Sequence, residues 1–284
     1  MLDNYATGRR DKLSDVWDSV ELVEGDLTSY ERVHNAVRGV DYVLHLGALP
    51  SVPRSVQDPL TTSQVNITGT LNVLLASRDE KIRRVVYASS SSVYGNTPAL
   101  PKVETMPTTP MSPYAVAKLC GEGYCQSFAR VYGMETVSLR YFNVFGPRQN
   151  PMSQYAAVIP KFITMMREGE RPTVNGDGEQ SRDFTFVANV VAATIGAATA
   201  SEAAVGRFMN IACGERFTLN RLVAELNGIL GTALDPEYFP ERVGDVRDSL
   251  ADIALAGELI GYAPSVSFQE GLRRTAEYFV DGGI

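Results

Sequence analysis

Short runs of β-branched and aromatic residues alternate with longer amphipathic stretches through the first half of the chain. The apolar runs predict strands at 20–24 (VELVE), 41–46 (DYVLHL), 84–89 (RVVYAS) and 136–141 (TVSLRY). The helical spacing between them predicts helices at 30–37, 61–77 and 113–132. Strands that are apolar on both faces and alternate with helices are typical of a doubly wound parallel sheet. We therefore expect an α/β fold.

The pattern changes after about residue 145, where the turn-rich segment GPRQNP (146–151) interrupts the alternation. Beyond it the sequence predicts a helix at 158–168, a loop at 175–184, a helix at 187–199 and a region punctuated by Pro and Gly to residue 262. We expect a first domain over 1–150 and a smaller C-terminal α/β lobe over 151–284. Part of 182–200 is expected to return to the first domain.

Composition and charge exclude several classes of function. The net charge is −7 and long basic runs are missing, which argues against a nucleic-acid partner. The sequence has no apolar stretch of about 18 residues, so we expect no membrane span. The first residues lack the apolar core of a signal peptide, which favours the cytoplasm. Three cysteines and two histidines form no spacing typical of a metal site.

The most specific local signal for chemistry is the segment SPYAVAK (112–118). Ser112 is a good N-cap and Pro113 suits the first helical position, so a helix is predicted to begin here. Tyr114 and Lys118 are then neighbours on one helical face. An ammonium beside a phenol stabilises the phenolate, so we expect Lys118 to lower the pKa of Tyr114 and make it a general base.

A second signal lies upstream, in the segment ASSSSVYG (88–95). Its four consecutive hydroxyls follow a predicted strand, at the edge where parallel sheets bind ligands. Taken alone, the segment is equally consistent with a serine-rich turn. Combined with the Tyr–Lys pair, it resembles the Ser/Tyr/Lys catalytic set of the extended short-chain dehydrogenase/reductase family, also described as NAD-dependent epimerases/dehydratases.

The resemblance extends from Leu2 to about Ala263. Its other motifs are HLGALPSVPRSVQDP (45–59), NITGTLNVL (66–74), LRYFNVFGPRQNP (139–151), NGDGEQSRDF (175–184) and ERVGDVRDSLAD (241–252). Their order is most similar to bacterial epimerases acting on UDP-N-acetylglucosamine. The resemblance implies a Rossmann-like NAD-binding domain at 1–150, a nucleotide-sugar-binding lobe, and a homodimer formed through the helix that bears Tyr114.

The resemblance also implies a role for individual residues. The implied catalytic residues are Ser90, Tyr114 and Lys118. Asp3 would hold the adenosine ribose, Asp26 and Leu27 the adenine, and Lys118 the nicotinamide ribose. The full set implied for NAD is Asp3, Asn4, Asp26, Leu27, Leu46, Gly47, Ala48, Asn66, Ser89, Tyr114, Lys118 and Tyr141. The set implied for the sugar nucleotide is Ser51, Ser90, Ser91, Ser92, Tyr114, Asn143, Gln149, Ala157, Val174, Asn175, Arg182, Arg242, Asp245 and Ser249.

Two residues guide the choice of reaction and substrate within the resemblance. Related dehydratases and decarboxylases carry a carboxylate just before the VYG, where this chain has Ser92. A 4-epimerase through a 4-keto sugar is therefore expected, with dehydratase and decarboxylase as alternatives. Ser249 stands where a bulky side chain would close the sugar pocket, which favours an N-acetylhexose. UDP-glucose or UDP-glucuronate remains the alternative substrate.

The predicted fold lacks its first β-α unit, because no glycine-rich pyrophosphate turn precedes Asp3. The adjacent strands would lose their neighbour, and their backbone groups would lose hydrogen-bond partners. We interpret this as a misplaced start or a truncation of an enzyme whose later motifs are intact. The other interpretation is a nucleotide-sugar-binding protein that has lost the redox step.

Overall fold

The computed structural model describes residues 1–151, 157–241 and 246–282. The chain forms two compact units, each made of several segments. Unit 1 contains residues 1–95, 108–140 and 194–209. Unit 2 contains residues 96–107, 141–193 and 210–282 of the described chain. Each unit is described separately below.

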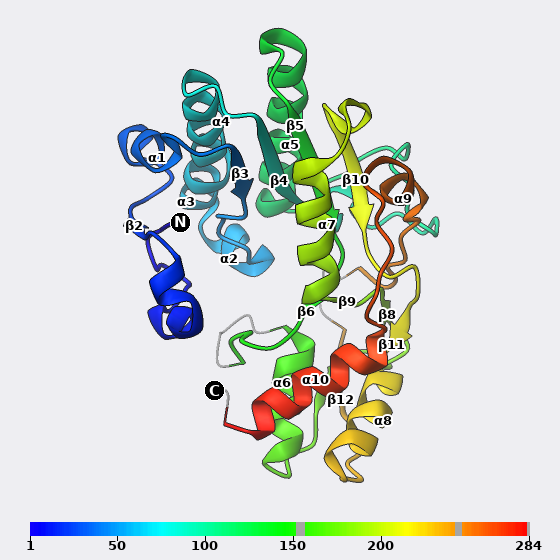
Figure 1. Cartoon of the computed structure of the whole chain (residues 1–284). Helices are drawn as coiled ribbons and strands as arrows, with labels where there is room; N and C mark the ends of the chain where they lie inside the picture. Colours follow the sequence, from blue (N-terminus) through cyan, green and yellow to red (C-terminus); the bar gives the residue numbers. More distant parts are fainter. Residues whose placement is uncertain (152–156, 242–245, 283–284) are drawn as a thin grey trace. The chain divides into compact units, whose positions relative to one another are not determined.

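A four-stranded sheet is the centre of unit 1 (Figure 1). Its strand order is β10 (Arg207–Ile211), β5 (Thr136–Tyr141), β4 (Arg84–Ser90) and β3 (Tyr42–His45). Strands β3 and β4 pair in parallel, with Tyr42 opposite Arg84. Nearly every residue of β4 is buried. The α/β fold with a parallel sheet is therefore confirmed.

The first two strands pair with each other and not with this sheet. Strand β1 (Leu2–Asp3) pairs in parallel with β2 (Val23–Glu24), and β3 ends the four-stranded sheet. Leu44 and Leu46, at the end of β3, are 44% and 58% exposed. Strands of a doubly wound sheet are normally covered on both faces. Among the described residues, β3 is thus the last strand of this sheet, and apolar side chains are exposed at its carboxyl end.

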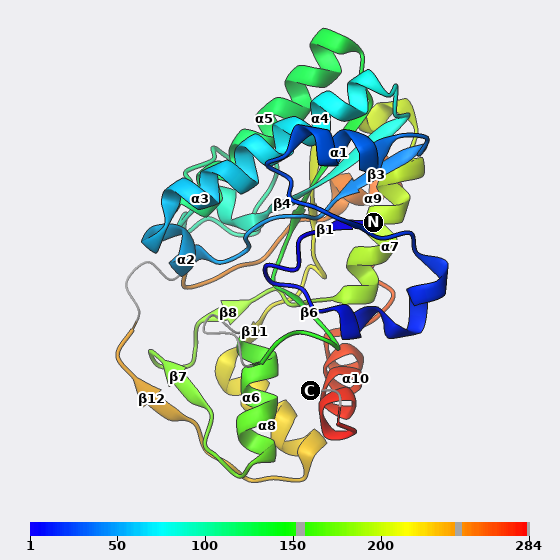
Figure 2. The same ribbon diagram turned by 90° about the vertical axis from the view of Figure 1, so that its left-hand side faces the viewer.

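Helices of unit 1 pack on the sheet and on one another (Figure 2). They are α1 (Tyr30–Val37), α2 (Val52–Gln57), α3 (Pro59–Ser63), α4 (Gly69–Asp79) and α5 (Pro113–Tyr132). Short 3-10 segments cover Arg10–Ser19, Ser91–Tyr94 and Glu202–Ala204. The single helix predicted at 61–77 is wrong in detail, because the π-helical segment Gln64–Thr68 separates α3 from α4.

Helix α5 begins and ends where its sequence predicts. The Ser112 hydroxyl accepts a hydrogen bond from the Ala115 N–H at 3.2 Å, and Pro113 is the first helical residue. Gly133 ends the helix in the left-handed conformation, with a φ of 65°. Midway along it, a side chain at Gly121 would collide with the Tyr87 ring of β4. Glycine at this position therefore lets α5 lie directly against the strand.

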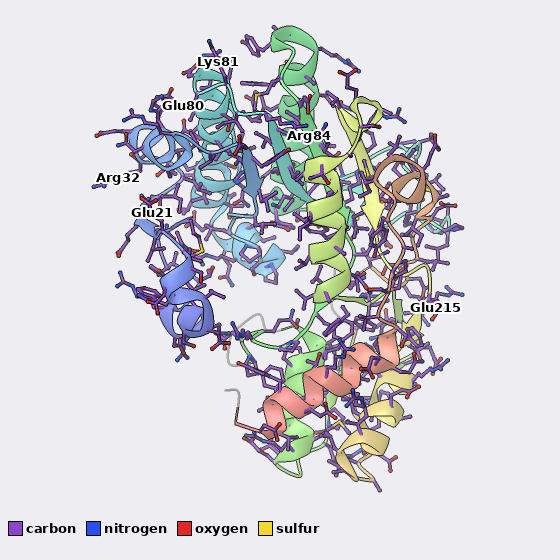
Figure 3. The ribbon with its side chains drawn as sticks, in the orientation of Figure 1. Glu21, Arg32, Glu80, Lys81, Arg84 and Glu215 are labelled. Carbon is purple, nitrogen blue, oxygen red and sulfur yellow. The ribbon has the colours of Figure 1, made fainter. Side chains whose placement is uncertain are left out.

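A buried arginine fixes the start of β4 (Figure 3). The Arg84 guanidinium forms an ion pair with Glu135 at 2.7 Å. It also donates to the carbonyl oxygens of Ala197 and Ala200, at 3.0 and 2.7 Å. A buried charge is tolerated only when its donors are satisfied in this way. Arg84 thus joins the strand to the last turn of α7 (Val187–Thr199) and to the residue after it.

Unit 2 packs around a cluster of aromatic side chains. Phe145, Phe184, Phe186, Phe217 and Phe268 are all buried there, and the Phe217 and Phe268 rings stack at 4.1 Å. The helices that contribute to this core are α6 (Val158–Arg167), α8 (Leu219–Leu230) and α10 (Phe268–Val280), and α9 (Ala254–Ile260) lies elsewhere in the same unit. The described residues of this unit also form three two-stranded sheets. Strand β6 (Val144–Phe145) pairs with β9 (Thr185–Phe186), and β7 (Thr173–Asn175) pairs with β12 (Glu237–Phe239). Strand β8 (Ser181–Arg182) pairs with β11 (Phe217–Thr218).

Candidate active site

The carboxyl end of β4 and the first turn of α5 bring two hydroxyls together. Ser90 is the last residue of β4 and caps the 3-10 turn that follows, accepting from the Ser92 N–H at 3.2 Å. The Tyr114 phenol lies near the Ser90 side chain, which lowers the pKa of the phenol. The Tyr114 backbone N–H donates to the buried Ser55 hydroxyl at 3.1 Å, which anchors this turn of α5. Two of the three predicted catalytic residues therefore meet at one point.

Lys118 lies one turn further along α5, but its effect on Tyr114 differs from the prediction. Its ammonium donates to the Ala88 carbonyl oxygen at 2.7 Å and is 5.9 Å from the Tyr114 ring centroid. Burial lowers the pKa of Lys118 to about 8. Burial raises the pKa of Tyr114, and the nearby Ser90 opposes that rise. The predicted lowering of the Tyr114 pKa is wrong for the protein alone, because desolvation of the phenolate is the largest effect.

The other serines of the 88–95 segment differ in their surroundings. The Ser89 hydroxyl donates to the buried carboxylate of Glu122 at 2.5 Å. The Ser92 hydroxyl is buried and has no hydrogen-bond partner in the part of the chain that the structure describes. Buried hydroxyls are rarely left in this state. Ser92 is therefore suited to bind a polar group of a ligand, whereas the side chain of Ser89 already has a partner.

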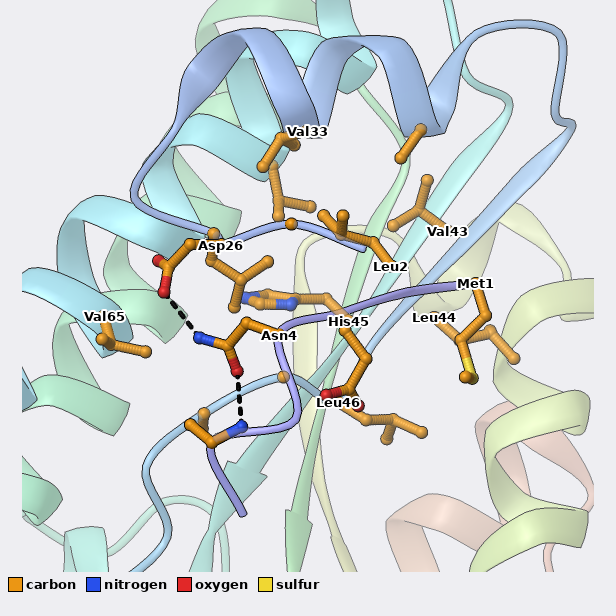
Figure 4. A pocket seen from close by; sticks show the side chains of 18 of the residues that line it. Met1, Leu2, Asn4, Asp26, Val33, Val43, Leu44, His45, Leu46 and Val65 are labelled. Atoms are coloured by element: carbon orange, nitrogen blue, oxygen red, sulfur yellow. Dashed lines mark hydrogen bonds between the residues drawn. The ribbon is translucent and has the colours of Figure 1, made fainter. Parts of the chain in front are cut away.

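A cavity of about 630 Å³ lies beside β1, β2 and β3 (Figure 4). The side chains of Asn4 and Asp26 form one part of its wall, where the Asn4 amide donates to the Asp26 carboxylate at 2.6 Å. Leu2 and Val43 form an apolar part of the wall. His45 also lines it, and burial lowers the pKa of His45 to about 3, so this imidazole is neutral. The cavity thus offers both apolar contacts and carboxylates.

Seven of the twelve residues predicted to bind NAD line this cavity. They are Asp3, Asn4, Asp26, Leu27, Leu46, Gly47 and Ala48. Asn66 acts on the cavity indirectly, because its amide accepts from the Leu49 N–H at 2.8 Å and donates to the Leu49 carbonyl at 3.1 Å. It thereby holds the 47–49 loop that forms part of the wall.

In unit 2 a second group of predicted residues meets around a buried carboxylate. The Asn143 amide donates to the Ser249 hydroxyl at 3.0 Å and to the Asp183 carbonyl at 3.1 Å. The Asp183 carboxylate accepts from the N–H groups of Cys213, Gly214 and Ala251, at 2.9, 3.1 and 3.2 Å. Burial raises the pKa of Asp183 to about 6, and these three donors oppose the rise. Asp183 therefore positions the segments that carry Asn143 and Ser249.

Replacing Asp183 by asparagine should destabilise the protein by about 2 kcal/mol or more. An amide presents one oxygen where the carboxylate presents two, so its NH₂ group would face backbone N–H donors. Urea unfolding of the two proteins at pH 8 measures the difference in the free energy of unfolding. Asp177→Asn, at an exposed ion pair with Arg247, is the control and should leave that free energy nearly unchanged. Equal stabilities for wild type and Asp183→Asn would contradict this role.

Several predicted substrate residues are engaged in local structure. Arg182 donates to the carbonyl oxygens of Ser181 and Arg247, at 2.9 and 2.8 Å. Gln149 donates to the Val144 carbonyl within its own turn, at 3.0 Å. Ser51 caps α2, and Ser91 begins the 3-10 turn after β4. Their roles toward a substrate stay predictions.

The remaining predictions are placed as follows. Tyr141 is half-buried at the end of β5, and Ala157 is exposed just before α6. Val174 is fully buried in the core of unit 2, so only its backbone is available to a ligand. The Asn175 carbonyl accepts from Gln180 at 2.5 Å. Arg242 and Asp245 lie outside the described residues.

A sequence model of the NAD dependent epimerase/dehydratase family matches residues 2–212. The chain belongs to this family. Among curated relatives of this epimerase/dehydratase, the UDP-glucose 4-epimerase of Mycolicibacterium smegmatis is 35% identical over 286 residues. That match covers 98% of this chain and 89% of the relative.

The structure of the chain is closely similar to several solved structures. The UDP-N-acetylglucosamine 4-epimerase of Methanobrevibacter ruminantium, in complex with UDP-N-acetylmuramic acid, has a TM-score of 0.94 and 40% identity over 99% of this chain and 89% of that chain. The UDP-glucose 4-epimerase of Thermus thermophilus, in complex with NAD, has a TM-score of 0.90 and 33% identity, covering 99% and 90%.

NAD is the cofactor of the epimerase/dehydratase family, and the cavity chemistry fits its adenosine end. The Asp3 and Asp26 carboxylates can accept hydrogen bonds from ribose hydroxyls or the adenine amino group, while Leu27 and Leu46 present apolar surface to the base. A carboxylate at Asp3 also repels a 2′-phosphate, which favours NAD over NADP.

The structure was also searched for metal sites and for membrane-spanning helices. Among the described residues, no cluster of three His, Cys, Asp or Glu side chains is arranged to hold a metal ion. Among the same described residues, no helix is long and apolar enough to cross a membrane.

The sequence interpretation missed three residues that shape the site of this epimerase/dehydratase. Glu122 and Arg140 form a buried ion pair beside Ser89, and Asp183 organises the loops around Ser249. A signal for Glu122 was available, because it follows Tyr114 and Lys118 at spacings of four along one face of α5. A charged residue at such a position in a buried helix face needs a partner.

Proposed function

We propose that this protein interconverts the C4 epimers of a UDP-hexose with NAD, and that the hexose is N-acetylglucosamine or N-acetylgalactosamine. The observation that carries the proposal is the placement of Ser90, at the carboxyl end of β4, beside the first turn of α5 with Tyr114, while the Lys118 ammonium is held one turn further along by the Ala88 carbonyl. A phenol that can exchange a proton beside a second hydroxyl is what oxidation of a sugar alcohol requires.

The residues of the chain divide the work of the reaction. Tyr114 takes the proton from the sugar O4 and later returns it. Ser90 donates a hydrogen bond to the same oxygen as its charge changes. When bound, NAD would supply a reversible hydride acceptor for C4 of the sugar. Asp3 and Asp26, which line the cavity, would hold the adenosine end of NAD, and Lys118 would hold the ribose near Tyr114.

The absence of a carboxylate from residues 88–95 favours epimerisation over dehydration or decarboxylation. Those reactions need a second group to move a proton at another carbon, and Ser92 is a poor acid or base at neutral pH. Mass spectrometry of the product separates the three reactions. An epimer keeps the mass of the substrate, whereas dehydration removes one water and decarboxylation one carbon dioxide. A product of lower mass would contradict the proposal.

The choice of sugar depends on Ser249, whose small side chain is held by Asn143. A serine leaves room that a larger side chain would fill, which supports an N-acetyl substituent. UDP-glucose and UDP-glucuronate are the alternative substrates, and the name of the M. smegmatis relative favours the first of them. A nucleotide-sugar-binding protein without redox activity is the alternative of another class, against which the Ser90–Tyr114 pair argues.

We also propose a homodimer through the helices around Tyr114. In unit 1, α2 and α3 pack against α5 and expose Val52, Val56 and Leu60 by 41%, 64% and 77%. Val116 on α5 is 44% exposed. Apolar side chains gathered on adjacent helices are typical of subunit contacts. Sedimentation velocity measures the state directly, and a monomer at micromolar concentration would contradict the proposal.

A further inference from the structure

Three consecutive residues at the end of β4 each lie against a different turn of α5. The Ala88 carbonyl accepts from the Lys118 ammonium at 2.7 Å. The Ser89 hydroxyl donates to Glu122 at 2.5 Å. Ser90 lies near the Tyr114 phenol and lowers its pKa. The outer two of these contacts involve predicted catalytic residues, whereas the middle one involves a carboxylate without an assigned role.

Glu122 is itself held by a buried arginine. Both groups are almost fully excluded from water, and Arg140 is 1% exposed. Arg140 donates to Glu122 through Nε at 2.8 Å and through Nη2 at 2.7 Å, which gives a two-pronged ion pair between β5 and α5. Such a fork fixes orientation as well as distance. The carboxylate oxygen that accepts from Arg140 Nε also accepts from Ser89.

The arginine also contacts the turn that follows Ser90. Its guanidinium carbon is 4.7 Å from the Tyr94 ring centroid and 4.0 Å from that of Phe208. Tyr94 is the last residue of the 3-10 turn that Ser90 caps, and it is buried. Arg140 therefore contacts the far end of the turn that begins at Ser90, while Glu122 holds the residue just before Ser90.

We infer that Glu122 and Arg140 are positioning residues which fix the carboxyl end of β4, and with it Ser90, against the helix that bears Tyr114, and that the Ser89 hydroxyl transmits this constraint. Only the expected effect on the reaction rate rests on the proposed function. If Ser89 slides or rotates relative to α5, its neighbour Ser90 moves with it, because adjacent residues of a strand are covalently fixed. Small misplacements of groups that share a reacting atom lower the rate strongly.

The inference also gives Ser89 a role different from binding NAD. Its hydroxyl is committed to a buried carboxylate at 2.5 Å, so removing it should leave NAD affinity unchanged. Ser89→Ala is the informative variant, since it keeps the ion pair intact and removes only the link to β4. Removing Glu122 would instead leave Arg140 buried without a counter-charge, and the variant would report on folding.

The test is the ionisation of the Tyr114 phenol in the 284-residue protein, followed by NMR of ¹³Cζ-labelled tyrosine. The Tyr114 signal is assigned with Tyr114→Phe. Ser90 lowers the pKa of this phenol, so Ser89→Ala, which loosens the end of β4 that carries Ser90, should raise it. Ser77→Ala removes a buried hydroxyl that lacks a partner among the described residues of unit 1, and it should leave the phenol unchanged.

Kinetics provide the second readout. If the wild type epimerises a UDP-hexose, Ser89→Ala should lower kcat about tenfold with KM and NAD affinity unchanged. An unaltered Tyr114 pKa in Ser89→Ala would overturn the inference, whether or not the thermal midpoint falls. A loss of NAD affinity would assign Ser89 to the cofactor and overturn it as well. An inactive wild type whose Tyr114 pKa still responds to Ser89→Ala would count against the proposed function and support the positioning role.

Discussion

Replacing Tyr114 by phenylalanine should lower kcat for C4 epimerisation by about 10³-fold, because the group that exchanges the O4 proton is removed. The ring stays in place, so KM for the UDP-sugar should change little. Steady-state conversion of UDP-N-acetylglucosamine, followed by chromatography, measures both constants. In the wild type kcat should rise with pH through the alkaline range, since burial raises the pKa of Tyr114 and the active form is the phenolate. The residual rate of Tyr114→Phe should lack that rise.

Tyr124→Phe is the matched control, because Tyr124 lies on the same helix and packs against a separate part of the core of unit 1. Its kcat should stay within about twofold of the wild type, as expected for a hydroxyl remote from the chemistry. A Tyr114→Phe enzyme that keeps more than a tenth of wild-type kcat would show that another group moves the O4 proton.

Replacing Ser249 by tyrosine should lower kcat/KM for UDP-N-acetylglucosamine by about 100-fold and leave UDP-glucose conversion largely intact. The serine is held by Asn143 at 3.0 Å, and a ring at this position would occupy the space assigned to the N-acetyl group. Parallel assays with the two UDP-sugars measure the ratio of the two kcat/KM values. The predicted result is a change in the ratio of the two kcat/KM values. A general loss of folded protein would lower both kcat/KM values equally and leave this ratio unchanged.

Ser249→Ala separates size from hydrogen bonding. It removes the acceptor for Asn143 without adding bulk, so both substrates should lose activity by a similar, small factor of roughly two to ten. If Ser249→Tyr lowers both kcat/KM values equally while the protein remains folded, Ser249 does not discriminate between the sugars.

The sequence predicted well those elements whose signals are local. Helix α5 was placed at its observed bounds because Ser112, Pro113 and Gly133 mark its ends through backbone chemistry alone. The strand at 84–90 was found because a fully buried parallel strand is a continuous apolar run. The proximity of Ser90 and Tyr114 was predicted from a resemblance in motifs. The number of residues between them in the sequence does not by itself indicate that they lie close together.

Other features depend on tertiary structure and left weaker signals. The pKa of Tyr114 depends mainly on how deeply the phenol is buried. The sequence spacing predicted only that Lys118 lies near Tyr114 on the helix, and it carried no information on burial. The pairing of Glu122 with Arg140 joins a helix to a strand 18 positions away, which no local pattern encodes. The break between α3 and α4 was also missed, since apolar periodicity continues through the π-helical segment.

The most direct test of the epimerase proposal is product formation from UDP-N-acetylglucosamine and NAD. The 284-residue protein and a version with a strand and glycine-rich turn added before Met1 are incubated in parallel, and the nucleotide sugars are separated by chromatography. The proposal predicts UDP-N-acetylgalactosamine of unchanged mass, formed by at least one of the two proteins without net formation of NADH. If both proteins are folded and neither converts this substrate, UDP-glucose or UDP-glucuronate to its C4 epimer, the proposed function is wrong.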